Sequence, residues 1–248
     1  MSLKLDVNLS RNYSINFDLP KRSKNKIIFL ILHYTGMRKE SDAIKRLCDH
    51  QSKVSSHYLI KNNGQIVNIV PDLYTAWHAG KSRWKQFQSL NKYSIGIEIS
   101  NPGHDHSYKK FKSKQISSLI KLLRYLIKKY TIKKQNILGH SDIAPNRKKD
   151  PGEKFPWQKL AIKNLCIWHF LDKVESKKNR NLIINKHEEK KFFRNLYSIG
   201  YPKIEKKKYK ISKTNLVKSF QRRFRQILIN GKIDKECLLI SKNLLKFK

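Results

Sequence analysis

Apolar residues in this chain are grouped in short runs whose spacing predicts β-strands. The near-continuous apolar run at 27–33 predicts a strand that is buried on both faces. Alternation of apolar and polar residues at 93–100 predicts a second strand. The β-rich runs at 56–60 and 65–70 flank an Asn-Gly pair at 63–64, which is the pattern of a β-hairpin.

Helices are predicted where apolar residues recur every three or four positions. This spacing occurs at 41–50, with Ser41 as the expected N-cap, and at 116–127. A further helix is expected from Trp157 to about Phe170, beyond a short strand at 136–139. The aromatic stretch 75–89 follows neither period, so we expect it to form a loop that lies over a functional site.

The order of these elements predicts the fold class. Strands and helices joined by both hairpin and crossover connections indicate an α/β fold with a mixed central β-sheet flanked by helices. Two amphipathic patterns, at 192–197 and 216–227, add a small C-terminal helical module. The expected units are an N-terminal lead-in at 1–24, a sheet domain at 25–170, a linker at 171–187 and a helical domain at 188–248.

The charge of the chain is extreme. Its 248 residues carry a formal net charge of +37. A nucleic acid or another anionic polymer as partner would explain this charge. A lysine-rich composition, in which Lys fills any exposed position, would explain it too. Because no recognition helix, zinc finger or RNP-like motif is present, we expect no specific nucleic-acid partner. The positive surface would still attract an acidic substrate.

The cysteines, the N-terminus and the apolar runs match none of the patterns that are typical of disulfide-bonded, secreted or membrane proteins. The three cysteines, Cys48, Cys166 and Cys237, are widely separated and are interpreted as ordinary thiols rather than metal ligands or disulfide partners. The N-terminus lacks the apolar segment of a signal peptide, which favours the cytoplasm. The longest apolar run, 27–32, is too short for a transmembrane helix, which needs about 20 residues.

Two histidines and an aspartate lie at positions that suit a metal site. His33 and His140 each follow an apolar strand, and Asp150 lies beyond a loop that contains Pro145. Catalytic zinc needs three protein ligands and an open position for water, and a His/His/Asp set meets that need. Any one of these residues could instead be structural, because a lone histidine at a strand end often is.

Two further residues are candidates for the chemistry. Glu98 faces away from Ile97 and Ile99 in its strand, and a carboxylate in such a strand needs a partner or a role. It could act as a general base on a metal-bound water, or be a surface residue of an edge strand. Lys148 precedes Asp150 by two positions and could stabilise an oxyanion, although charged neighbours at 147 and 149 allow a plain surface role.

Several separated motifs occur together in one order. They are LHYT at 32–35, VSSHYLI at 54–60, AWHAG at 76–80, SIGIEI at 94–99, and GHSDIAP at 139–145 with KKDPG at 148–152. In this order they resemble the zinc-dependent N-acetylmuramoyl-L-alanine amidases of the type 2 amidase family, which is related to T7 lysozyme-type amidases and peptidoglycan recognition proteins. The Phe155-Pro156-Trp157 ending and the C-terminal module resemble the AmiD-like branch.

The resemblance implies roles for particular residues. It implies that residues 25–170 form the catalytic domain and bind one Zn²⁺ per chain. The implied ligands are His33, His140 and Asp150, the implied base is Glu98, the implied oxyanion stabiliser is Lys148, and the implied lining of the substrate cleft is Trp77, His78 and Ala79. His57 matches a family position but is interpreted as structural. Ser56 replaces the catalytic tyrosine of the T7-like branch, so Glu98 must act as the base.

The C-terminal segment resembles a diverged three-helix peptidoglycan-binding domain. In that pattern the FQ pair at 220–221 opens a helix, and NGKID at 230–234 is the turn before the last helix. An unrelated helical tail is the alternative. The expected partner is peptidoglycan or a muropeptide, bound by a monomer, and the AmiD-like resemblance also allows a periplasmic or envelope location. A catalytically silent peptidoglycan-binding protein is the alternative function, although all the implied zinc ligands are present.

Overall fold

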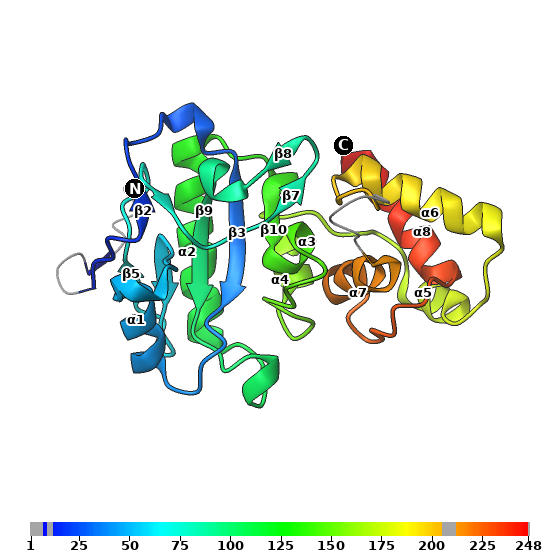
Figure 1. The fold of residues 1–248 in the computed structure, drawn as a ribbon. Coiled ribbons are helices and arrows are strands. Elements are labelled where there is room, and N and C mark those ends of the chain that lie inside the picture. Colours follow the sequence, from blue (N-terminus) through cyan, green and yellow to red (C-terminus); the bar gives the residue numbers. More distant parts are fainter. Residues whose placement is uncertain (1–6, 9–11, 205–211, 248) are drawn as a thin grey trace.

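A mixed β-sheet with helices on both faces forms the larger part of the molecule, as the sequence predicts (Figure 1). The computed structural model describes residues 7–8, 12–204 and 212–247. The sheet has six strands in the order β1-β5-β4-β9-β3-β10. These strands are β1 (Val7–Asn8), β3 (Phe29–Tyr34), β4 (Tyr58–Ile60), β5 (Ile66–Asn68), β9 (Ser94–Ile99) and β10 (Ile137–Gly139).

The predicted hairpin is confirmed. β4 and β5 pair antiparallel, with Leu59 opposite Val67. Gly64 in the turn has φ +91°, a conformation that glycine adopts at little cost. All the other pairings in the sheet are parallel, so their strands are joined by crossover connections.

Four short strands lie outside the main sheet. They are β2 (Phe17–Asp18), which pairs with β6 (Thr75–Ala76), and β7 (Arg83–Trp84), which pairs with β8 (Phe87–Gln88). Three of them fall in the aromatic stretch 75–89, which the sequence predicts only as a loop.

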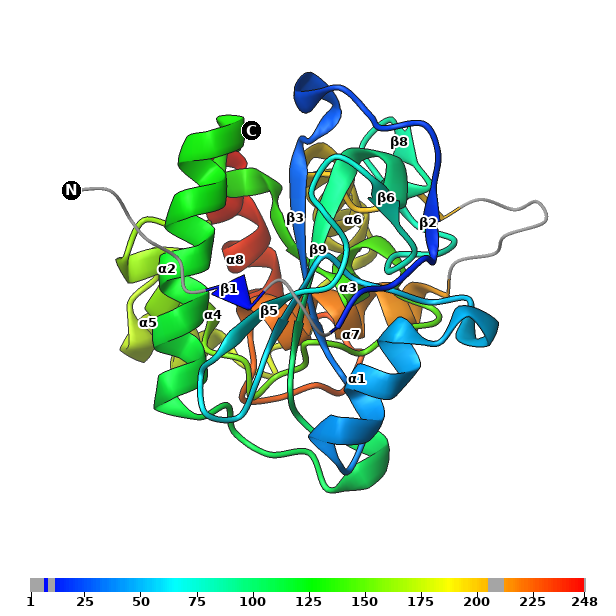
Figure 2. The same cartoon turned by 90° about the vertical axis from the view of Figure 1, so that its left-hand side faces the viewer.

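The helices cover the sheet and extend beyond it. They are α1 (Glu40–Cys48), α2 (Ser113–Tyr130), α3 (His140–Ile143), α4 (Trp157–Ile162), α5 (Lys173–Asn179), α6 (Lys186–Ile199), α7 (Lys213–Phe224) and α8 (Lys235–Leu244). Figure 2 shows α2 on one side of β3 and β9, with α1 and the β6–β8 region on the other. Leu119 and Leu123 of α2 pack with Leu30 and Leu32 of β3 in one core cluster.

The ends of two predicted helices are wrong. α1 begins at Glu40 after Lys39, so Ser41 is not its N-cap, and its hydroxyl bonds to Asp42 instead. The helix expected to reach Phe170 ends at Ile162 as α4, because Asn164 takes the left-handed conformation, with φ 57°.

The C-terminal module is helical, as predicted. We use this name for residues 186–204 and 212–247, which include α6, α7 and α8. The FQ pair does not open a helix, since α7 begins at Lys213 with Ser212 as its N-cap. The NGKID turn is confirmed, because Asp234 caps α8 by accepting a hydrogen bond from the Cys237 N–H.

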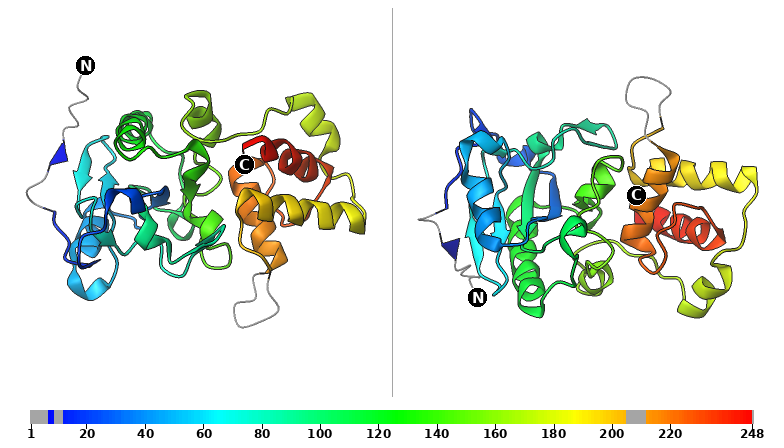
Figure 3. Two further views of the ribbon diagram at one scale, coloured as in Figure 1. Left: turned by 90° about the horizontal axis from the view of Figure 1, so that it is seen from above. Right: turned by 60° about the horizontal axis from the view of Figure 1, so that its bottom comes forward.

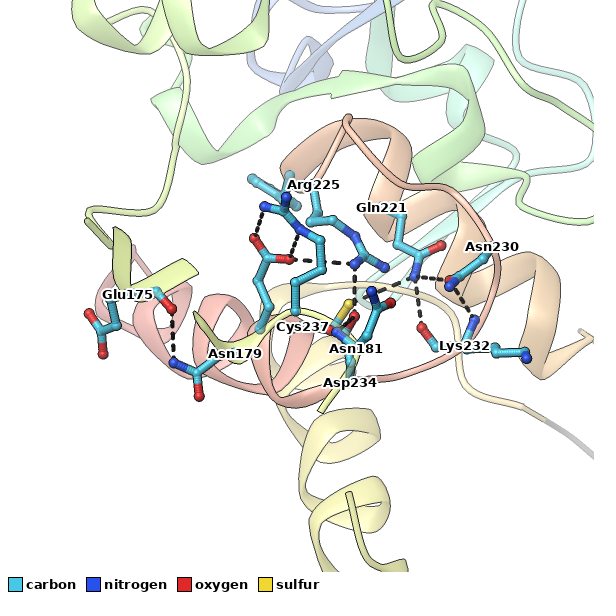
Figure 4. Close-up of polar contacts among 12 residues, drawn as sticks. Glu175, Asn179, Asn181, Gln221, Arg225, Asn230, Lys232, Asp234 and Cys237 are labelled. Carbon is cyan, nitrogen blue, oxygen red and sulfur yellow. Dashed lines mark hydrogen bonds and ion pairs between the residues drawn. The ribbon is translucent and has the colours of Figure 1, made fainter. Parts of the chain in front are cut away.

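Polar contacts join the ends of the module's helices (Figure 4). The Gln221 amide donates to the Asn230 side chain and to the Lys232 carbonyl, and Arg225 pairs with Asp234 at 2.8 Å. The segment 171–187, expected to be a linker, contains α5. Arg180 just beyond α5 forms a bidentate pair with Glu236 of α8, so this segment packs on the module.

The module lies beyond the β10 edge of the sheet (Figures 1 and 3). In both panels of Figure 3, the orange helix α7 is the part of the module nearest the sheet domain. Cys48, Cys166 and Cys237 are free thiols in the structure. In the described residues, no helix combines the length and apolarity that a bilayer span requires.

Strand register positions the candidate site. His33 of β3 is paired with Glu98 of β9, and Leu32 is paired with Gly139 of β10, the residue before His140. Because these three neighbouring strands are parallel, their carboxyl ends meet at one edge of the sheet. His33, Glu98 and His140 therefore come together there.

Candidate metal centre

The two histidines and the aspartate singled out in the sequence converge on one point. His33 Nδ1 lies 2.9 Å from His140 Nδ1, and each nitrogen lies 3.0 Å from Asp150 Oδ2. All three residues are buried. Two imidazole nitrogens and a carboxylate oxygen facing one another at these distances are consistent with a metal site.

The far side of the His140 ring is fixed by a backbone carbonyl. His140 Nε2 lies 3.1 Å from the Ala79 oxygen, so Nε2 carries the proton and donates it. Nδ1 is then left with a lone pair directed at the site. The Arg147 guanidinium also donates to the Ala79 oxygen, at 2.8 Å. Ala79 thus acts through its carbonyl, while its side chain is buried in the core.

The far side of the His33 ring is fixed by a chain of side chains. The Ser94 hydroxyl donates to the Leu90 carbonyl at 2.6 Å and can accept a proton from His78 Nε2 at 3.2 Å. His78 Nδ1 is then free to accept the proton of His33 Nε2 at 3.1 Å. This chain leaves His33 Nδ1 unprotonated and directed at the metal site, as a ligand must be.

The close approach of His78 depends on a glycine. A Cβ atom at position 96 would lie 2.4 Å from His78 Cγ, so no other residue fits there without displacement. The ring of His57, whose centroid lies 5.6 Å from that of His78, accepts the Gly96 N–H at Nδ1 and bonds to the Tyr74 carbonyl through Nε2. Both ring nitrogens of His57 are therefore used for structure, as the sequence predicts.

Burial and neighbouring charges set the protonation of the site. Burial, with His140 close by, lowers the pKa of His33 to about 4. Burial acts to raise the pKa of Asp150, but His140 and His33 outweigh it and bring that pKa below its usual range. The site therefore holds an ionised carboxylate and a neutral His33 near pH 7, the forms that bind a metal.

Glu98 lies beside the three candidate ligands and lines the same cleft. Its Oε2 is buried and unpaired among the described residues. Burial and the nearby Asp150 raise the pKa of Glu98 well above its usual range, while Lys148 acts in the opposite direction. A carboxylate with a raised pKa and a free oxygen is suited to take and return a proton.

These groups line one cleft of about 570 Å³. Trp77 forms part of its wall, and its indole N–H donates to Asp18 at 2.7 Å. His78 also reaches the cleft, but its ring is buried against His33. The lining residues include His33, Glu98, His140, Lys148 and Asp150, and also Arg46 and Leu47 of α1. Trp77 and His78 thus line the cleft, as expected, whereas Ala79 is not among the lining residues.

A family model for N-acetylmuramoyl-L-alanine amidases matches residues 23–153, which include this cleft and the three candidate ligands. Over 233 residues, the chain is 35% identical to the amidase AmiD of Escherichia coli, a match that covers 89% of this chain and 83% of AmiD. The chain belongs to the N-acetylmuramoyl-L-alanine amidase family. It is an amidase that acts on muropeptides or peptidoglycan.

Solved structures of family members have the same fold. The complex of E. coli AmiD with the substrate anhydro-N-acetylmuramic acid-L-Ala-D-γ-Glu-L-Lys matches with a TM-score of 0.77 and 32% identity, over 92% of each chain. AmpDh3 of Pseudomonas aeruginosa, solved with an anhydromuramic pentapeptide, matches with a TM-score of 0.77 and 27% identity, over 96% of this chain and 98% of that one. These matches include the C-terminal module.

The residues that hold the metal ligands in place from behind are not evident from the sequence. Ala79 and Ser94 lie in the motifs at 76–80 and 94–99, but the roles of the Ala79 carbonyl, Ser94 and Arg147 arise from contacts between distant segments, which the sequence does not show. The AWHAG motif indicates that residues 76–80 have a role at the site, but it does not show whether they form the wall of the cleft or hold the metal ligands in place.

Proposed function

We propose that this amidase is zinc-dependent and hydrolyses the amide bond between N-acetylmuramic acid and L-alanine. The observation that carries the proposal is the convergence of His33 Nδ1, His140 Nδ1 and Asp150 Oδ2, 2.9–3.0 Å apart. Beside them lies Glu98, whose buried Oε2 has no hydrogen-bond partner in the part of the chain that the structure describes. Family membership supports the same reaction.

The donor set fits zinc. Atoms that each bind one zinc ion at about 2.0–2.2 Å lie roughly 3–3.6 Å from one another, close to the spacing in this chain. Two neutral imidazoles and one carboxylate are also a usual ligand set for catalytic zinc. Zinc held by these residues would supply Lewis-acid activation of water and of the scissile carbonyl.

Glu98 is the proton carrier in this proposal. Its carboxylate accepts a proton from the attacking water as the new C–O bond forms at the lactyl carbonyl. It then returns that proton to the L-Ala nitrogen as the C–N bond breaks, which gives a free carboxyl group on the sugar and a free amine on the peptide. The raised pKa of Glu98 helps it to hold the proton between the two steps.

Lys148 is proposed to stabilise the negative charge that develops on the carbonyl oxygen. It lines the cleft together with Glu98 and Asp150, and its charge acts on the pKa of both Glu98 and His33. A cation in a partly closed cleft stabilises such charge more than it would in water. Trp77 offers an indole at the cleft wall on which a sugar ring can pack.

Anhydro-muropeptides are the proposed soluble substrates. AmiD and AmpDh3 were solved with anhydromuramic peptides, and both resemble this chain over nearly its whole length. The test is the release of free tripeptide from anhydro-N-acetylmuramyl-tripeptide, measured by chromatography and mass spectrometry. Wild-type protein with zinc should release the peptide, with the cut between the sugar and L-Ala.

The matched variants are Glu98→Gln and Glu175→Gln. The first removes the proton carrier with little change of shape, and kcat should fall by about 10²- to 10⁴-fold. The second makes the same change on the exposed face of α5 and should leave kcat unchanged. Full activity in Glu98→Gln would refute the assigned role, and cleavage at a different bond would refute the proposed reaction.

A further inference from the structure

A buried ion pair joins the C-terminal module to the turn that carries His140. Arg223 Nη1 of α7 donates to Asp142 Oδ2 of α3 at 2.6 Å, and both side chains are at most 2% exposed. Arg223 Nη2 donates to the Ile137 carbonyl of β10 at 2.8 Å. One guanidinium thus holds both the strand before His140 and the turn after it.

Asp142 is the point where the module and the turn meet. Its Oδ2 accepts the Gly139 N–H at 2.8 Å, directly before His140. Its Oδ1 accepts the hydroxyl of Tyr201, a buried residue of the module, at 2.6 Å. The carboxylate therefore depends on donors from the module to keep the orientation that closes the turn at Gly139.

A third contact reaches the residue between His140 and Asp142. The Ser219 hydroxyl of α7 donates to the Ser141 carbonyl at 2.7 Å. The Ser141 N–H in turn donates to the Asp150 carbonyl at 2.9 Å. Through Ser141, the module is thus connected to the backbone of Asp150, the candidate ligand at the other end of this loop.

The module also shares its hydrophobic core with the sheet. Phe192 and Phe220 of the module belong to the same buried cluster as Phe29 and Ile31 of β3 and Leu138 of β10. The Arg223 guanidinium stacks on the Trp157 ring of α4, 4.5 Å from its centroid. The module and the sheet domain therefore share one buried interface, which includes the neighbourhood of His140.

We propose that Arg223 is a positioning residue for the metal centre: through Asp142 it fixes the backbone around His140. The inference rests on the proposed function in that the site is taken to bind zinc. The module's first role in this enzyme is then to hold the ligand loop, whether or not it also contacts the cell wall.

The chain offers a matched control for this role. Arg225, two positions along, is also buried, but it pairs inside the module with Asp234 (Figure 4) and with Glu236. Arg223→Met and Arg225→Met each remove a buried guanidinium from the same region. Only the first breaks a contact with the turn at His140, so general destabilisation of the module and loss of positioning can be told apart.

The first measurement is zinc affinity, from competition with a fluorescent chelator at a temperature where circular dichroism shows each variant folded. Arg223→Met should weaken zinc binding about 10- to 100-fold, as is typical when a group that supports a ligand is removed. Arg225→Met should leave the zinc affinity close to that of wild type, because Arg225 does not contact the residues around His140. Tyr201→Phe, which deletes one hydroxyl only, should give a smaller loss and serves if Arg223→Met does not fold.

The second measurement does not need the metal. In metal-free protein, hydrogen exchange at the Gly139 amide should be faster in Arg223→Met and Tyr201→Phe than in wild type, and unchanged in Arg225→Met. Unchanged exchange and unchanged zinc affinity in both turn-directed variants would overturn the inference. Failure of the wild-type protein to bind zinc would instead refute the proposed function, with the exchange result still deciding the role of Arg223.

Discussion

His78 has two possible roles in the cleft: contact with the substrate or support of the metal ligand His33. Replacing its side chain distinguishes the two. If His78 contacts substrate, its loss raises KM and leaves metal binding unchanged. If it supports His33, as the 3.1 Å contact between His33 Nε2 and His78 Nδ1 indicates, its loss weakens zinc binding. The informative pair is His78→Leu, which has no acceptor, and His78→Asn, which can keep an acceptor near the Nδ1 position.

The size of the effect follows from the tautomers of His33. Without metal, His33 can place its proton on Nδ1 and donate it to Asp150 Oδ2, 3.0 Å away. With metal bound, Nδ1 must be unprotonated, so the proton must sit on Nε2 and needs an acceptor. An unsatisfied buried donor costs about 1–3 kcal/mol. That cost falls only on the metal-bound state, which corresponds to about a 5- to 150-fold weaker zinc affinity.

The assay is a zinc titration in competition with a chelator, combined with kcat and KM on anhydro-N-acetylmuramyl-tripeptide at saturating zinc. We expect His78→Leu to show the full loss of affinity and His78→Asn a smaller one. An unchanged zinc affinity in His78→Leu, with a raised KM, would refute the support role and favour direct contact with substrate.

Three other changes give separate tests. Gly96→Ala places a methyl group 2.4 Å from His78 Cγ. It should lower the free energy of unfolding by about 1–3 kcal/mol in thermal unfolding and also weaken zinc binding. A variant as stable as wild type would mean that the His78 ring can shift without cost. Because the folded-state pKa of Glu98 is raised, its contribution to stability is present below the ordinary glutamate pKa of about 4.3 and is lost as pH rises. Metal-free Glu98→Gln should therefore be more stable than wild type in urea at pH 8, with the gap closing toward pH 4, and an equal gap at both would contradict the shift. Lys148→Met should lower kcat about 10²- to 10³-fold and leave the zinc affinity unchanged. Lys149→Met, the control, should lower kcat much less. An equal loss of kcat in the two variants would refute a specific role for Lys148.

The main features of the site could be predicted because they depend on strand ends. His33 and His140 follow apolar runs that form neighbouring parallel strands, and the register of β3 with β9 places Glu98 beside His33. Periodicity was enough to predict that Glu98 faces away from Ile97. The hairpin was predictable for a similar reason, since its Asn-Gly turn is local.

The parts that could not be predicted depend on contacts between distant segments. Arg223 in the sequence is one of many basic residues near the C-terminus, and only the packing of α7 on α3 reveals its pairing with Asp142. The motif at 76–80 predicts that Ala79 lines the cleft, whereas in the fold its carbonyl accepts hydrogen bonds and its side chain is buried. The early end of α4 reflects the left-handed conformation of Asn164, which the apolar pattern does not encode.

The central claim is that His33, His140 and Asp150 bind the zinc that this amidase needs. Its most direct test is a titration of chelator-treated protein with zinc, followed by release of free tripeptide from anhydro-N-acetylmuramyl-tripeptide. We predict no release without metal, full activity at one zinc per chain, and no recovery in Asp150→Ala. Release that survives removal of the metal, or an Asp150→Ala protein that recovers like wild type, would contradict the account.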